Sequence, residues 1–109
     1  MPVNALICFC TCPDPDTAER IATALVDERL AACVNLLPGL QSVYRWQGQV
    51  ERADEVLLLV KTTADRFDAL CARIKALHPA ELPEVLAVEA AVGLPAYLDW
   101  VAAQTRPTD

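Results

Sequence analysis

Residues 56–61 are Val-Leu-Leu-Leu-Val-Lys, an apolar run that does not alternate with polar side chains. Residues 85–88 and most of 5–10 lack this alternation as well. The strands of a sheet with one face in water normally alternate between apolar and polar side chains. These three segments therefore predict a sheet whose two faces both need to be covered.

Turn and cap residues divide the rest of the chain into helices and strands. Asp16 and Glu19 form an N-terminal helix-capping pattern. The pair Gln47-Gly48 is typical of a hairpin turn, and Pro79 ends a second helix. The expected strands are 3–10, 34–46 with a bulge or kink at Pro38-Gly39, 49–62 and 85–92, and the expected helices begin at Asp16, between Thr62 and Asp65, and near Pro95.

The order of these elements is β-α-β-β-α-β with a terminal helix. It predicts the α+β ferredoxin-like fold, in which two helices pack on one face of a four-stranded antiparallel sheet. The length of 109 residues suits one domain, residues 1–109, with a single core. Little chain remains to cover the second face of the sheet, so the sequence predicts association with further copies of itself.

Charge and cysteine content exclude several classes of function. The chain has 15 acidic and 9 basic residues and a net charge of −6, which argues against nucleic acid and anionic membrane surfaces as partners. No apolar run reaches the ~18 residues of a membrane span, and the first residues do not resemble a signal peptide. Five cysteines are most simply explained as reduced thiols in the cytoplasm.

Six segments carry a resemblance to a known family. They match the CutA family of divalent-cation tolerance proteins in order and in spacing, over essentially the whole chain. The segments are CTCPD (10–14), LAACVNLLPG (30–39), SVYRWQG (42–48), EVLLLVKT (55–62), HPAELPE (78–84) and YLDW (97–100).

The resemblance implies properties that the pattern alone does not give. Proteins of the family form tight homotrimers by edge pairing of the long second and third strands, resemble PII signalling proteins, and are mostly cytoplasmic in bacteria. They have been connected with copper tolerance and copper binding, and no enzymatic activity is established for them. We therefore expect a trimeric, non-enzymatic protein that binds copper or another divalent cation and responds to metal ions.

The resemblance also points to a metal site. Cys10 matches a cysteine at the end of the first strand that is a copper ligand in the family, and His78 matches its histidine partner. Thiolate and imidazole are suitable ligands for copper, and Cys12 lies on the same side of the strand as Cys10. The alternatives are that the alternating cysteines fill the core as small apolar residues, and that His78 caps a helix end.

A second group of residues is expected at subunit clefts, where PII-like proteins bind small effectors. Aromatic residues in this group are equally well explained as interface anchors. Lys61 ends an apolar strand, so its ammonium group must reach water or meet a carboxylate such as that of Glu84. The group comprises Trp46, Lys61, Glu84, Tyr97 and Trp100, with Tyr44 beside them.

Other functions of the same fold fit less well. The loop 12–16 carries two carboxylates and two prolines, so it does not suit the phosphate site of an acylphosphatase. The Cys10-x-Cys12 spacing differs from the Met-x-Cys-x-x-Cys of a copper chaperone, and a Cys10–His78 hydrolase lacks an evident oxyanion site. The main alternative is a PII-like scaffold that binds an effector or a protein in the subunit clefts, with metal binding incidental.

Overall fold

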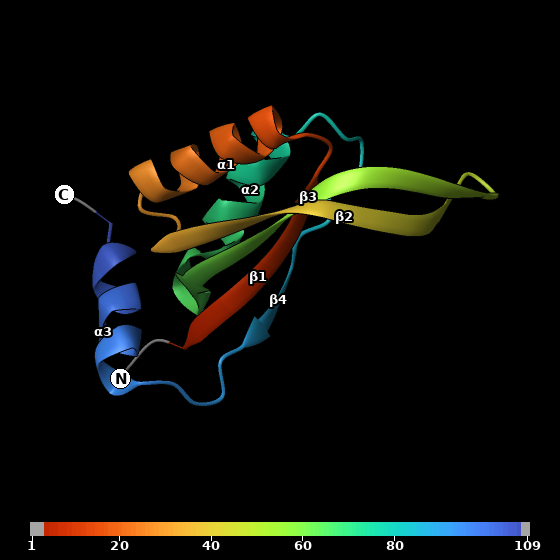
Figure 1. The fold of residues 1–109 in the computed structure, drawn as a ribbon. Coiled ribbons are helices and arrows are strands. Elements are labelled where there is room, and N and C mark those ends of the chain that lie inside the picture. Colours follow the sequence, from red (N-terminus) through yellow and green to blue (C-terminus); the bar gives the residue numbers. More distant parts are fainter. Residues whose placement is uncertain (1–3, 108–109) are drawn as a thin grey trace.

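The structure is a computed structural model that describes residues 4–107 (Figure 1). Val3, the predicted start of the first strand, lies outside this range. The elements follow in the predicted order: β1 (Ala5–Cys12), α1 (Pro15–Asp27), β2 (Cys33–Trp46), β3 (Gln49–Thr63), a 3-10 turn (Ala64–Arg66), α2 (Phe67–Leu77), β4 (Leu86–Glu89) and α3 (Pro95–Gln104).

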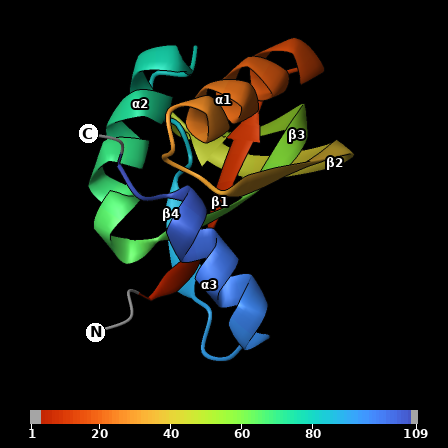
Figure 2. The same cartoon turned by 90° about the vertical axis from the view of Figure 1, so that its left-hand side faces the viewer.

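The four strands form one sheet in the order β2-β3-β1-β4, and the neighbouring strands are antiparallel. Helices α1 and α2 lie together on the same face of this sheet, as Figures 1 and 2 show. Helix α3 contacts β1 and β3 and lies at the end of the sheet where β1 begins. The predicted α+β ferredoxin-like fold is thus confirmed. No helix among residues 4–107 is long and apolar enough to cross a membrane.

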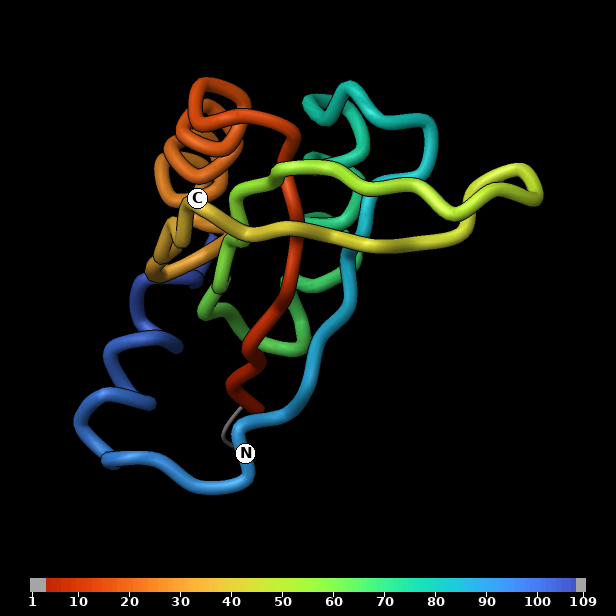
Figure 3. Tube along the Cα trace, turned by 45° about the vertical axis from the view of Figure 1, so that its right-hand side comes forward, coloured from red at the N-terminus to blue at the C-terminus, as the bar shows by residue number. Residues whose placement is uncertain are grey.

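The β2–β3 hairpin projects beyond the rest of the sheet as a two-stranded arm (Figure 3). Its predicted turn is present: Gln47 and Gly48 have φ angles of 50° and 81°, which suits a tight turn that follows the twist of the strands. The register shifts between Leu37 and Leu40, so the predicted irregularity at Pro38-Gly39 is confirmed as well. Gly39 has a φ of 81° there.

The core lies between the sheet and helices α1 and α2. Strand β1 contributes Cys8, Cys10 and Cys12, all fully buried. Their partners on β3 are Val60, Leu58 and Val56, which share this face because residues paired across strands point to the same side. The helices close the core with fully buried apolar side chains, namely Ile21 and Leu25 of α1 and Leu70 and Ile74 of α2.

The other face of the sheet carries no layer formed by α1 and α2. Phe9 on β1 pairs with Leu59 on β3 and with Leu86 on β4, so these side chains share that face. Phe9 and Leu59 are half-buried, and Leu86 is 52% exposed. These strands therefore lack alternation between apolar and polar side chains because both faces of the sheet are apolar. Burial of the second face by other copies stays a prediction.

Several element boundaries differ from the expectations. The second helix, expected to begin between Thr62 and Asp65, begins at Phe67 after a 3-10 turn at Ala64–Arg66. Helix α1 is capped by Asp14 rather than Asp16: the Asp14 carboxylate accepts a hydrogen bond from the Thr17 N–H at 2.7 Å. Pro15 occupies the first turn, where its missing N–H costs nothing. Strand β1 extends to Cys12 because β3 still pairs with it there. Strand β4 ends at Glu89, opposite Leu6 at the start of β1, where little partner strand remains.

Candidate metal centre and adjoining groove

Strand β1 places three thiols in a row against the helices. Cys8, Cys10 and Cys12 alternate along the strand and are all 0% exposed. The prediction that they share one face is therefore confirmed. Cys12 is the last residue of the strand, so the Cys10–Cys12 pair lies at the end of the sheet from which the β2–β3 arm projects.

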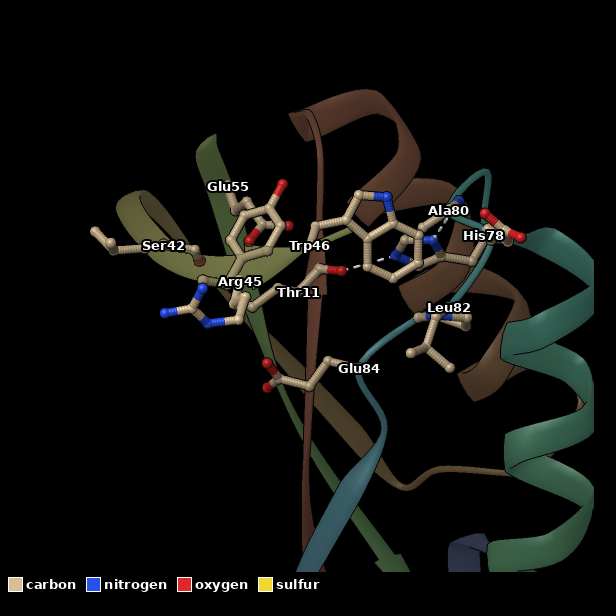
Figure 4. Close-up of a pocket in the computed structure, with 13 residues that line it drawn as sticks. Thr11, Ser42, Arg45, Trp46, Glu55, His78, Ala80, Leu82 and Glu84 are labelled. Atoms are coloured by element: carbon tan, nitrogen blue, oxygen red, sulfur yellow. Dashed lines mark hydrogen bonds between the residues drawn. The ribbon is translucent and has the colours of Figure 1, made fainter. Parts of the chain in front are cut away.

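His78 reaches this end of β1 from the C-terminal end of α2. It follows α2 with an extended backbone, as expected before Pro79. Its Nε2–H donates to the Thr11 carbonyl at 2.7 Å, and its Nδ1 accepts from the Ala80 N–H at 3.0 Å (Figure 4). Strand β4 pairs with β1 only as far as Phe9. The His78 ring thus binds a backbone carbonyl of β1 at a point where β4 no longer pairs with that strand.

These two bonds change the interpretation of His78 as a helix cap. An Nδ1 that accepts a hydrogen bond carries no proton, so the ring is the neutral Nε2–H tautomer. The backbone N–H of His78 does close α2, because it donates to the Ile74 carbonyl at 2.8 Å. His78 is therefore the C-cap residue of α2 through its backbone, while its ring bonds β1 and the following loop.

The sulfur atoms of Cys10 and Cys12 and a ring nitrogen of His78 lie within 4.8 Å of one another, and all three residues are buried. Bonds of about 2.3 Å to sulfur and about 2.0 Å to imidazole are usual for metal sites, so donors that share an ion lie within about 4.6 Å of each other. Small side-chain shifts would therefore bring all three onto one ion. Two thiols and an imidazole form a soft donor set, which suits copper.

Protonation of the two thiols is coupled. A hydrogen bond between them, together with burial, raises the pKa of Cys10. The same bond lowers the pKa of Cys12 against the effect of burial. Of the two thiols, Cys12 is therefore the more readily deprotonated. Glu55 and Glu84 also raise the pKa of Cys10 through their charge.

A groove of about 890 Å³ opens beside this donor set. One wall is the part of the arm around Ser42–Trp46, and the other is the segment 80–84 that follows His78 (Figure 4). Thr11 and His78 line the groove as well. His78 therefore belongs both to the groove lining and to the donor set.

The residues predicted for subunit clefts separate into distinct places in the single chain. Trp46, Glu84 and the neighbouring Tyr44 line the groove. Tyr97 and Trp100 stack on each other on α3, with ring centroids 5.6 Å apart. Lys61 does not pair with Glu84, since its Nζ donates to Asn35 Oδ1 on the neighbouring strand. The chain alone does not bring these five residues together.

Several groove residues were not predicted as functional candidates, among them Thr11, Arg45, Glu55 and Glu81. Thr11 acts through its backbone carbonyl, which no side-chain pattern reveals. Glu55 could have been found, because it is the polar residue directly before the apolar run at 56–60. Arg45 lies near the hairpin turn, and only the path of the arm places it opposite segment 80–84.

Comparison with known proteins gives consistent matches. The family model described as CutA1 divalent ion tolerance protein matches residues 6–104. The divalent-cation tolerance protein CutA of Thermus thermophilus is 55% identical over 95 residues, covering 87% of this chain and 92% of that protein. Protein CutA of Mus musculus is 43% identical over 101 residues, which cover 93% of this chain. The match spans only 57% of the mouse protein's length.

Solved structures of similar proteins agree over nearly the full chain. The divalent cation tolerance protein of Thermus thermophilus has a TM-score of 0.92 and 51% identity, covering 94% of this chain and 99% of that one. CutA1 of Oryza sativa has a TM-score of 0.94 and 38% identity, covering 98% of both chains.

Proposed function

The chain belongs to the CutA1 divalent ion tolerance protein family, and from this membership we propose that it binds copper through Cys10, Cys12 and His78 as part of tolerance to divalent cations. Its relatives carry the name divalent-cation tolerance protein. One observation carries the metal site: two sulfur atoms and an imidazole nitrogen, contributed by distant parts of the chain, lie within 4.8 Å of each other.

The donor set favours the reduced form of the metal. Thiolate sulfur selects Cu(I) among the forms of copper, and the three residues are buried where soft, low-coordinate ligation is undisturbed by water. Each coordinating thiol releases its proton to solvent. His78 must give up one of its two hydrogen bonds to supply a nitrogen lone pair. These features support a site that holds copper through two sulfur atoms and one imidazole nitrogen.

An anaerobic titration of the reduced protein with Cu(I), against a competing chelator, tests the proposal. We expect one ion per chain in the wild type, loss of that binding in Cys10→Ser, and clear weakening in Cys12→Ser and His78→Gln. Cys33→Ser is the matched control, because Cys33 is a half-exposed thiol on β2, outside the donor set. Equal weak binding by all variants would contradict the proposal.

The quaternary structure and location complete the proposal. Half-buried apolar side chains on the uncovered face, such as Phe9 and Leu59, support a homotrimer in which copies cover each other. All five cysteines are free thiols, which supports a cytoplasmic location. Relatives differ in this respect: the rice protein is named chloroplastic, and a solved archaeal one is described as periplasmic.

The groove supports a second candidate function. It is large enough for a small molecule, and three of the predicted cleft residues, Tyr44, Trp46 and Glu84, line it. In this alternative the protein is a PII-like scaffold that binds an effector or a partner protein, and metal binding is incidental. Copper binding that does not depend on Cys10 would favour it.

A further inference from the structure

The groove and the donor set meet at one residue. His78 lines the groove, and one of its ring nitrogens lies within 4.8 Å of both sulfur atoms. Cys10 and Cys12 are 0% exposed and are not part of the groove lining. An ion that enters from the groove therefore meets the imidazole before it meets a thiol.

The lining of the groove is acidic. Three carboxylates, those of Glu55, Glu81 and Glu84, face a single guanidinium, that of Arg45. Within residues 4–107 none of these four side chains takes part in an ion pair; the ion pair found there joins Arg73 and Glu28, at 3.0 Å. Unpaired carboxylates in a concave site concentrate cations from solution.

Two of these carboxylates lie on opposite walls of the groove, at the end of β1 that holds the thiols. Glu55 directly precedes Val56, which pairs with Cys12, so its backbone lies at the end of β1 and its side chain points to the sheet face opposite the thiols. Glu84 is on the opposite wall, in the segment that leads to β4 (Figure 4). A cation between them is attracted to the end of the sheet that holds the donor set.

We propose that this groove is the entrance to the buried centre: Glu55 and Glu84 draw the cation in, and His78 passes it to Cys10 and Cys12. The inference rests on the proposed copper site and adds a route to it. The ion enters as Cu(I) and stays Cu(I), so no electron is transferred. Carboxylate contacts are exchanged for the imidazole and then for sulfur, and each thiol that binds releases its proton to solvent.

The route makes a kinetic prediction distinct from affinity. Carboxylates that only attract the ion on its way are not ligands in the final complex, so their removal should slow loading without weakening the complex. Electrostatic steering changes association rates by about 10-fold to 1,000-fold. With two charges removed from a partly solvated groove, we expect about a tenfold slower association at low salt. The difference should shrink as salt screens the charges.

Stopped-flow loading under anaerobic conditions tests this route. Cu(I) is supplied as its cationic acetonitrile complex, and the growth of copper–thiolate absorption reports arrival at sulfur. The test variant is Glu55→Gln/Glu84→Gln. The matched control is Glu19→Gln/Asp27→Asn, which removes the same charge from exposed positions on α1. Chelator competition gives the equilibrium affinity of each protein.

The outcomes separate the entrance from the site itself. Slower loading of the test variant alone, with wild-type affinity, supports the entrance. Loading of the test variant at the wild-type rate overturns the entrance and leaves the copper site intact. A loss of affinity in the test variant as large as its loss of loading rate also overturns the entrance, because the carboxylates would then be ligands. If the wild type binds no copper at equilibrium, both the proposed function and the entrance fail.

Discussion

Replacing His78 by alanine should destabilise the protein even when no metal is present. The ring bonds the Thr11 carbonyl at 2.7 Å and the Ala80 N–H at 3.0 Å, and the residue is only 9% exposed. Each lost hydrogen bond costs about 1 kcal/mol, and the lost burial of the ring adds about 1 kcal/mol. We therefore expect the free energy of unfolding to fall by about 3 kcal/mol per chain.

Two conservative substitutions each retain one of the two hydrogen bonds of the His78 ring, so their contributions can be measured separately. In His78→Gln the side-chain amide can replace Nε2–H as a donor to the Thr11 carbonyl. In His78→Asn the side-chain carbonyl can replace Nδ1 as the acceptor from the Ala80 N–H. Each variant should recover about 1 kcal/mol relative to His78→Ala, because each retains one bond. The rescue would not occur if His78 served only as a metal ligand.

The assay is chemical denaturation in a chelator-containing buffer, at one fixed chain concentration because assembly contributes to stability. A wild-type denaturation midpoint for His78→Ala would refute the structural role. Identical losses for the alanine, glutamine and asparagine variants would show that the two hydrogen bonds contribute nothing of their own.

Three further predictions concern the core, pH and assembly. Leu58→Ala removes a fully buried side chain and should cost about 3 kcal/mol in urea denaturation, whereas Val43→Ala on the exposed arm should change stability by less than about 0.5 kcal/mol. Burial raises the pKa of Cys8 from 9.0 to about 11. The neutral thiol therefore makes its full contribution to the free energy of unfolding below pH 9.0, and this contribution is lost as the pH rises through about 11. Thermal unfolding across this range should decline less steeply in Cys8→Val. Leu59→Glu places a charge on the uncovered face and should convert a trimer in light scattering to single chains, and a wild-type mass of one chain would contradict the proposed assembly.

The fold was predictable because its main determinants are local. The apolar run at 56–60 indicated a strand with two apolar faces, and Gln47-Gly48 marked the turn that sets the register of β2 against β3. The helix cap was misplaced by two residues because both Asp14 and Asp16 stand beside a proline. Only the hydrogen bond to Thr17 decides between them. The length of β4 depended on where β1 begins, which is not a local property.

The sequence indicated which residues belong to the candidate site, but not how they come together. Alternation placed Cys10 and Cys12 on one face, but nothing in the residue pattern brings His78 to them, since it lies 67 residues beyond its partner Thr11. Resemblance to a family supplied that pairing. The groove could not be anticipated at all, because its walls come from the arm and from the segment 80–84, which meet only in the folded chain.

The structural role of His78 and its proposed role as a metal ligand compete, because both use the same ring nitrogens. Both ring nitrogens accept or donate a hydrogen bond, one with β1 and one with the segment that forms a groove wall. A cation that takes a lone pair from Nδ1 displaces the Ala80 N–H, and one that takes it from Nε2 displaces the Thr11 carbonyl. At about 1 kcal/mol per bond, either displacement lowers the affinity of the site about fivefold relative to an imidazole with a free nitrogen. A ligand held in this way binds more weakly but is already positioned, which suits a residue that both closes the end of the sheet and receives an ion from the groove.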